Sequence, residues 1–234
     1  MSILHTALVV IALAQATPHA ARPPRDLAIY HVLVRDKLVA LTFDDGPSTE
    51  FTPKVLEILN RYQVKATFFL VGAQVVANQH LAKELIARGH AIGNHTWGHP
   101  RLWEQSPEVM QDEIQLCQEE LERVLVARTP YFRPPEGLCT EDMLKLVRRE
   151  HYTLVMWTVA LEHKLSPSAH AEAQRVLLLI QPGDIILAHD GGPHRERTVE
   201  ALPLVIAGLQ ARDYRLVTIP ELIAAGKKSV GAQP

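Results

Sequence analysis

From Asp36 onward, short apolar segments alternate with segments of helical periodicity. The apolar segments predict seven strands at residues 38–43, 66–71, 91–94, 131–133, 153–159, 185–189 and 215–219. In one intervening segment, Met110, Ile114 and Leu121 share a helical face, and Ser106 followed by Pro107 is typical of a helix start. Repeated strand-then-helix order predicts parallel strands joined by helical crossovers, so we expect an α/β sheet or a closed barrel. The sequence contains no short repeat and no low-complexity tract, so we expect no second domain.

The N-terminal region has a different pattern. Residues 3–13 are mostly apolar and lead into Ala14-Gln15-Ala16, which is typical of a secretory signal peptide, here assigned to residues 1–20. The alternatives are a misassigned start or a short amphipathic extension, and the segment is too short to span a bilayer comfortably. We expect cleavage after about Ala16 or near Ala20, and a secreted, periplasmic or envelope-associated product.

Prolines and composition set the remaining boundaries. Two prolines in Ala21-Arg-Pro-Pro-Arg25 favour a linker over residues 21–35, followed by a catalytic domain at 36–226 and a C-terminal tail at 227–234. The chain has 234 residues, 47% of them hydrophobic, with 24 Lys and Arg against 26 Asp and Glu. This composition excludes a disordered chain and a protein that binds nucleic acid through a basic surplus.

The two cysteines, Cys117 and Cys139, cannot form a disulfide framework or a four-thiolate zinc site. A single bridge between them remains open. Any metal ion must therefore be held mainly by histidines and carboxylates.

Polar residues gather where the predicted strands end. In parallel α/β folds, binding and catalytic groups lie at the carboxyl ends of the strands. Four of these ends supply two adjacent carboxylates, three imidazoles and a guanidinium: Asp44, Asp45, His95, His99, Arg133 and His189. We expect a polar site at this edge of the sheet.

Asp44 and Asp45 would project to opposite sides of an extended strand, so they could have different roles. The glycine and proline near His95 and His99 favour a loop. Two imidazoles and one carboxylate suit zinc and leave positions open for water and substrate. Their strand-end placement favours a catalytic metal site over a surface turn and two unrelated histidines.

Four motifs together resemble those of the polysaccharide deacetylase family, also called carbohydrate esterase family four. They are Thr42-Phe43-Asp44-Asp45-Gly46-Pro47, His95-Thr96-x-x-His99, Arg133-Pro134-Pro135 and Ile185-x-Leu187-x-His189. The similarity extends over roughly residues 36–226. It implies a distorted (β/α) barrel of about seven or eight units, which agrees with the strand prediction.

The resemblance implies that one divalent metal ion is bound by Asp45, His95 and His99. Zinc is the expected ion, with cobalt, nickel or manganese as alternatives. The expected reaction is hydrolysis of N-acetyl or O-acetyl groups on a polysaccharide.

The resemblance also implies roles for four further residues. Asp44 is the expected general base and His189 the expected general acid. Arg133 is expected to orient the base, and the backbone N–H of Glu136 is expected to stabilise negative charge on the carbonyl oxygen.

Two positions depart from the family pattern. Glu136 stands where the family commonly has Tyr. After the fifth predicted strand, Ala160 and His163 replace a pair of Asp residues that usually supports the Arg and tunes the catalytic His. Either Glu162 substitutes from a shifted position, or the acid is tuned differently.

These observations predict an enzyme that removes N-acetyl groups from N-acetylglucosamine-containing polysaccharide such as peptidoglycan or chitin. The alternatives are an acetyl-xylan-type O-deacetylase and a non-catalytic carbohydrate-binding relative. A polysaccharide or oligosaccharide is the expected partner, with no nucleic acid, no transmembrane span and a monomeric chain.

Overall fold

The computed structural model describes residues 20–126 and 128–231. Within these residues nine strands form one sheet in the order β1-β6-β5-β4-β3-β2-β8-β7, and β9 also pairs with β2. All pairings between named strands are parallel. The strands are β1 (Ala28–Ile29), β2 (Leu38–Asp44), β3 (Thr67–Leu70), β4 (Ala91–Asn94), β5 (Tyr131–Phe132), β6 (Thr153–Val155), β7 (Val159–Ala160), β8 (Ile185–His189) and β9 (Arg215–Val217).

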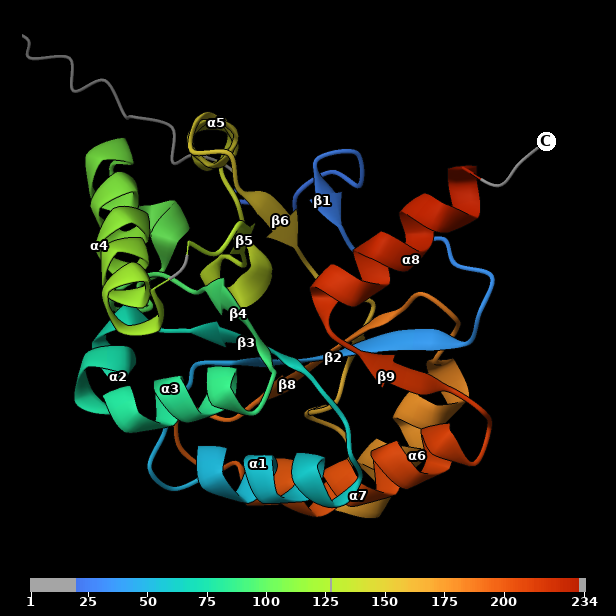
Figure 1. Ribbon diagram of the computed structural model, residues 1–234. Coiled ribbons are helices and arrows are strands. Elements are labelled where there is room, and N and C mark those ends of the chain that lie inside the picture. Colours follow the sequence, from blue (N-terminus) through green and yellow to red (C-terminus); the bar gives the residue numbers. More distant parts are fainter. Residues whose placement is uncertain (1–19, 127, 232–234) are drawn as a thin grey trace, which may run out of the picture.

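Helices surround this sheet (Figure 1). They are α1 (Thr52–Arg61), α2 (Gly72–Ala77), α3 (Gln79–Ala87), α4 (Pro107–Leu125), α5 (Glu141–Arg149), α6 (Ala169–Leu179), α7 (Glu196–Gln210) and α8 (Ile219–Gly231), with 3-10 turns η1 (Leu102–Glu104) and η2 (Pro135–Gly137). The predicted α/β class is confirmed: the chain is a single-domain, distorted (β/α) barrel.

The strand β2 is the centre of the fold. It pairs with β3, β8 and β9, and all seven of its residues are buried. Its apolar side chains Val39, Leu41 and Phe43 belong to the main hydrophobic core. Because both faces of β2 are covered by other elements, the end of this strand is held in place, and so are the residues that follow it.

The fifth predicted strand, 153–159, is divided in the structure. It forms β6 and then β7, separated by Met156, Trp157 and Thr158. At the break the backbone carbonyls of Val155 and Met156 accept hydrogen bonds from the Arg133 side chain. Because these carbonyls bind the buried guanidinium of Arg133, they are not available for strand pairing at the break between β6 and β7. The hydrophobic pattern alone did not indicate this break.

The ends of the chain also differ from the sequence boundaries. Strand β1 lies inside the predicted linker and pairs with β6, so part of residues 21–35 belongs to the sheet. Helix α8 continues to Gly231, past the predicted domain end at residue 226. The predicted signal peptide lies outside the described residues except for Ala20. Among the helices described, none is long and apolar enough to cross a membrane.

The predicted start of the helix after Ser106 is confirmed. Pro107 is the first residue of α4, and the Ser106 hydroxyl accepts a hydrogen bond from the Val109 backbone N–H. Cys117, on the buried face of α4, and Cys139 are both free thiols. The bridge left open by the sequence is therefore absent from this structure.

Candidate active site

Asp44 and Asp45 occupy the end of β2, where the chain leaves the extended conformation. Asp44 is the last residue of the strand, and Asp45 has a left-handed backbone with φ 72°. Both carboxylates consequently approach the same imidazole: His95 Nε2 lies 3.7 Å from Asp44 Oδ2 and 3.5 Å from Asp45 Oδ1. The sequence placed the two side chains on opposite sides only for an extended strand, and the left-handed backbone of Asp45 does not meet that condition.

Asp45, His95 and His99 form a compact cluster. One potential ligand atom from each residue lies within 4.8 Å of the others. His99 Nε2 lies 3.2 Å from Asp45 Oδ1. The structure therefore brings together the three residues that the sequence proposed as metal ligands.

The tautomer of His95 is fixed by its second nitrogen. Nδ1 lies 2.7 Å from the carbonyl oxygen of Arg133, and since a carbonyl can only accept, Nδ1 carries the hydrogen. In the neutral ring Nε2 is then unprotonated and faces the two carboxylates. Metal-binding histidines are commonly oriented in this way.

The cluster fits a divalent cation. Asp45 Oδ1 is buried and has no hydrogen-bond partner within residues 20–126 and 128–231, although it faces two imidazoles. Burial alone would raise the pKa of Asp45, but the neighbouring His95 and His99 hold it well below its ordinary value. An ionised, unsatisfied carboxylate oxygen beside two imidazoles is a suitable donor set for zinc.

Asp44 is held by a buried arginine. Arg133 is completely buried, and its Nη1 donates to Asp44 Oδ1 at 2.6 Å and to Thr42 Oγ1 at 2.9 Å. Its guanidinium also lies 4.1 Å from the centre of the Phe69 ring. Arg133 therefore fixes one oxygen of Asp44 and leaves Oδ2 on the side of His95.

His189 lies at the end of β8, opposite Asp44. In the parallel pairing of β2 with β8, Asp44 and His189 are direct Cα partners. Burial would lower the pKa of His189, but the hydrogen bond and charge of Glu162 outweigh it, with help from Asp44 and Asp45, so the pKa is raised. A more basic imidazole is better suited to hold a proton near neutral pH.

Glu162 resolves the alternative that the sequence left open. Its Oε2 lies 3.2 Å from His189 Nδ1, and its Oε1 accepts a hydrogen bond from the His189 backbone N–H at 3.0 Å. Ala160 and His163 do not supply this carboxylate. Glu162 does so from a shifted position, while Arg133 is supported by backbone carbonyls.

Glu136 lies in η2, shortly after Arg133, with a left-handed backbone of φ 57°. Its exposed side chain is 3.6 Å from Arg101 Nε. The carboxylate thus points to a neighbouring loop, which is consistent with a contribution from the backbone rather than from the side chain.

Sequence reasoning missed two residues of the site. Arg195 Nη2 lies 3.4 Å from Asp45 Oδ2. Asp190, completely buried, accepts a 2.5 Å hydrogen bond from Thr52 Oγ1. The available signal was the Gly191-Gly192-Pro193 turn after β8, since it returns the chain toward the strand ends.

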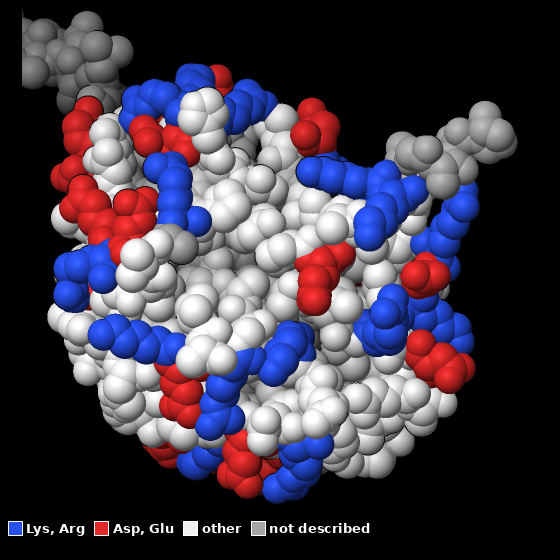
Figure 2. Space-filling view, viewed as in Figure 1, with Lys and Arg blue, Asp and Glu red and all other residues white. Residues whose placement is uncertain are grey.

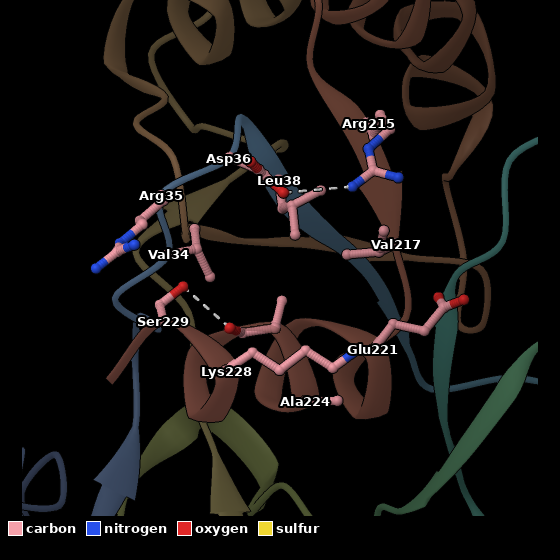
Figure 3. A pocket seen from close by; sticks show the side chains of 11 residues that line it. Val34, Arg35, Asp36, Leu38, Arg215, Val217, Glu221, Ala224, Lys228 and Ser229 are labelled. Atoms are coloured by element: carbon pink, nitrogen blue, oxygen red, sulfur yellow. Dashed lines mark hydrogen bonds and ion pairs between the residues drawn. The ribbon is translucent and has the colours of Figure 1, made fainter. Parts of the chain in front are cut away.

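Two cavities are relevant to the position of the site. One of about 640 Å³ borders it and is lined in part by Glu162 and Arg195. Another of about 500 Å³ lies at the amino-terminal ends of β2 and β9 and along α8 (Figure 3). In that cavity Arg215 and Asp36 point toward each other, with Nη2 3.7 Å from Oδ2 (Figure 3). It lies at the wrong end of the strands to be the active site.

Comparison with known proteins identifies the class. The family model for polysaccharide deacetylase matches residues 32–155. A peptidoglycan-N-acetylglucosamine deacetylase of Bacillus cereus is 34% identical over 202 residues, covering 86% of this chain and 94% of the relative. A chitooligosaccharide deacetylase of Bradyrhizobium sp. is 34% identical, covering 79% of this chain and 90% of that protein.

A solved structure agrees with the sequence comparisons. The Bc1960 peptidoglycan N-acetylglucosamine deacetylase, in a complex with a hydroxamate-type benzamide, superposes with a TM-score of 0.80 at 35% identity. The match covers 83% of this chain and 92% of that one. This chain belongs to the polysaccharide deacetylase family.

Proposed function

We propose that this chain is a metal-dependent N-deacetylase that releases acetate from N-acetylglucosamine units of a polysaccharide. The observation that carries the proposal is the pairing of Asp44 with His189 at the ends of adjacent strands, beside the cluster of Asp45, His95 and His99. A base, an acid and a metal-binding triad on one sheet edge are what amide hydrolysis needs.

Asp45, His95 and His99 would hold the divalent ion. When bound, zinc or a similar ion would polarise the acetyl carbonyl and would lower the pKa of a bound water to near neutral pH. The pKa of His99 is raised, because Asp45 favours its protonated form more than burial disfavours it. Metal binding must displace that proton, so metal affinity should increase with pH.

Asp44 would act as the general base. Arg133 occupies its Oδ1, so Oδ2 is the oxygen available to take a proton from the attacking water. The fixed guanidinium keeps the carboxylate oriented during this transfer. If the Asp44 carboxylate were moved from this position, the enzyme would lose turnover but would keep its metal ion.

His189 would act as the general acid. The departing amine is too basic to leave as an anion, so it must receive a proton as the C–N bond breaks. Glu162 favours the protonated imidazole and fixes Nδ1, so Nε2 is the nitrogen that donates. The backbone N–H of Glu136 would stabilise the negative charge that develops on the carbonyl oxygen.

The substrate proposal rests on the names of the relatives and on an open cavity. The cavity is lined in part by Glu162 and Arg195, which contact His189 and Asp45, and we assign it to neighbouring sugars of the substrate. Figure 2 shows Lys and Arg interspersed with Asp and Glu on one face of the molecule. Such a mixed surface favours peptidoglycan, chitin or an oligosaccharide of N-acetylglucosamine over a strongly acidic polymer.

Acetate release tests the proposal. The purified chain should release acetate and expose free amine from oligomers of N-acetylglucosamine, with longer oligomers better than the monosaccharide because remote sugars contribute binding. Exhaustive chelation should abolish the activity, and zinc or cobalt should restore it. Full activity with no metal detected by elemental analysis would contradict metal dependence.

Acetylated xylan in the same panel separates the alternatives. Activity on that substrate, with none on any N-acetylated glycan, would indicate an O-deacetylase. Glycan binding with no acetate release, in protein shown to contain metal, would indicate a non-catalytic relative.

Export is part of the proposal, with action outside the cytoplasm or at the cell envelope. It depends on the apolar segment at residues 3–13 and on the small residues after it. Mass measurement of the N-terminus from cell fractions tests it. An intact Met1 in a purely cytoplasmic product would contradict it and would favour a soluble oligosaccharide as substrate.

A further inference from the structure

The loop after β8 places a second arginine against the site. Arg195, immediately before α7, directs Nη2 to Asp45 Oδ2 at 3.4 Å, and its Nε donates to the Gly191 carbonyl at 2.8 Å. The second bond anchors the side chain to its own loop. About one fifth of each of the Arg195 and Asp45 side chains is exposed (22% and 19%).

The two oxygens of Asp45 have different surroundings. Oδ1 faces His95 and His99 and is buried without a hydrogen-bond partner in the part of the chain that the structure describes, whereas Oδ2 faces Arg195. We propose that Arg195 is a positioning residue for metal binding: it holds Asp45 Oδ2 so that Oδ1 alone is presented between the two imidazoles. The proposal rests on the metal dependence proposed above.

The local backbone is built around this contact. A Cβ at Gly191 would lie 2.0 Å from the Asp45 carbonyl oxygen, so only glycine lets the loop approach so closely. Gly192 has φ 74°, and a Cβ there would lie 3.2 Å from Arg195 Nη2. The two glycines therefore provide the space in which the arginine reaches the carboxylate.

The contact of Arg195 with Asp45 resembles the contact of Arg133 with the neighbouring Asp44. Arg133 occupies Oδ1 of Asp44 from the core, and Arg195 occupies Oδ2 of Asp45 from the surface side. Each arginine leaves one carboxylate oxygen facing His95. Two neighbouring aspartates in a crowded site are thus each restricted to one free oxygen.

Charge and positioning predict opposite results when Arg195 is removed. As a charge alone, a guanidinium close to a metal site repels the cation, so its loss should tighten metal binding. If Arg195 is a positioning group, its loss should instead weaken metal binding, because loss of a hydrogen-bond partner of a metal ligand typically weakens binding 10–100-fold. The sign of the change therefore distinguishes the two roles.

The test is zinc affinity of Arg195→Gln, measured by competition with a chromophoric chelator. We expect binding weaker by about 10–100-fold, with partial recovery in Arg195→Lys, which keeps the charge but loses the fork. Arg197→Gln is the matched control, since Arg197 lies two residues on and contacts Ser166 and Glu172 instead. Its affinity should equal that of the unaltered chain.

A cobalt spectrum gives a second readout. The visible absorption of the cobalt-loaded protein reports the ligand set, and it should change in Arg195→Gln but not in Arg197→Gln. Zinc binding by Arg195→Gln that is as tight as, or tighter than, that of the unaltered chain would overturn the positioning role and leave the deacetylase proposal intact. If the unaltered chain binds neither zinc nor cobalt, the metal-dependent function fails and this proposal fails with it.

Discussion

Glu162 contacts both the ring and the backbone of His189. Its Oε2 lies 3.2 Å from Nδ1, and its Oε1 accepts hydrogen bonds from the His189 N–H and from Thr198 Oγ1 at 3.0 and 2.6 Å. Because an ionised carboxylate can only accept, Nδ1 carries a hydrogen in either charge state of the ring. Burial would raise the pKa of Glu162, but His189 and Thr198 lower it, so the carboxylate stays ionised.

This relationship predicts a pH effect. The pKa of His189 is raised because the influence of Glu162 exceeds that of burial, and the protonated ring is the form that donates to the amine. Activity is therefore lost as pH rises through this pKa. Glu162→Gln should lower the pKa and move the alkaline limb of the kcat profile to lower pH.

The matched control is Glu200→Gln. Glu200 is an exposed residue of the same helix as Thr198, and its removal changes the net charge by the same amount. An alkaline limb that moves equally in both variants would assign the effect to general charge rather than to the contact with His189. An unchanged limb in Glu162→Gln would exclude the proposed tuning.

The adjacent aspartates should separate by role. Asp44→Asn should keep the metal and lose turnover by about 10²–10⁴-fold, which is the usual contribution of a general base. Asp45→Asn should lower the affinity for the metal ion, because Asp45 Oδ1 faces both imidazoles. Elemental analysis beside acetate release distinguishes these outcomes. Loss of metal in Asp44→Asn with retention in Asp45→Asn would reverse the assignment.

The two thiols should be inert in the folded protein. Burial raises the pKa of Cys117 and of Cys139 to about 12, so little thiolate forms near neutral pH. A thiol-reactive chromogenic disulfide should label neither in native protein and both in denaturant without reductant. Failure to label them in denaturant until reductant is added would indicate a bridge and contradict the free thiols of this structure.

The placement of the main site residues could be predicted from sequence, for a geometrical reason. Parallel strands end at one edge of a sheet, so apolar runs that end in Asp44, His95 and His189 had to bring those side chains together. Likewise, Ser106 before Pro107 marks a helix start whatever the tertiary context.

What escaped prediction depends on tertiary contacts. Strand β1 has only two residues and no periodicity of its own. The sequence named Glu162 as one of two alternatives and could not decide between them, because its contact with His189 depends on the path of the chain after β7. The contact of Arg195 with Asp45 joins positions 150 residues apart, and the path of the loop after β8 is set by packing. Even the directions of Asp44 and Asp45 depended on one left-handed residue, which no alternation of polar and apolar positions indicates.

Asp190 gives a prediction about folding stability. It follows His189, is completely buried, and its Oδ1 has no hydrogen-bond partner among the described residues. Burial raises its pKa from 3.8 to about 7, with the Thr52 hydrogen bond opposing the change and the charges of Asp45 and Asp44 adding to it. In the metal-free folded protein Asp190 therefore holds a proton that the unfolded chain releases near pH 4.

The sign follows from this difference in proton binding. The folded state holds more protons than the unfolded state between pH 3.8 and about 7, so this group stabilises the fold most at the low end. The contribution is lost as pH rises through about 7. Asp190→Asn mimics the protonated carboxyl and removes that dependence. The difference in Tm, unaltered chain minus Asp190→Asn, should therefore decrease as the pH rises from 4 to 7.

Both proteins are compared with metal removed by chelator, and Asp112→Asn, an exposed change on α4, serves as the control. Parallel Tm curves for the unaltered chain and Asp190→Asn across this range would show that Asp190 is already ionised in the fold.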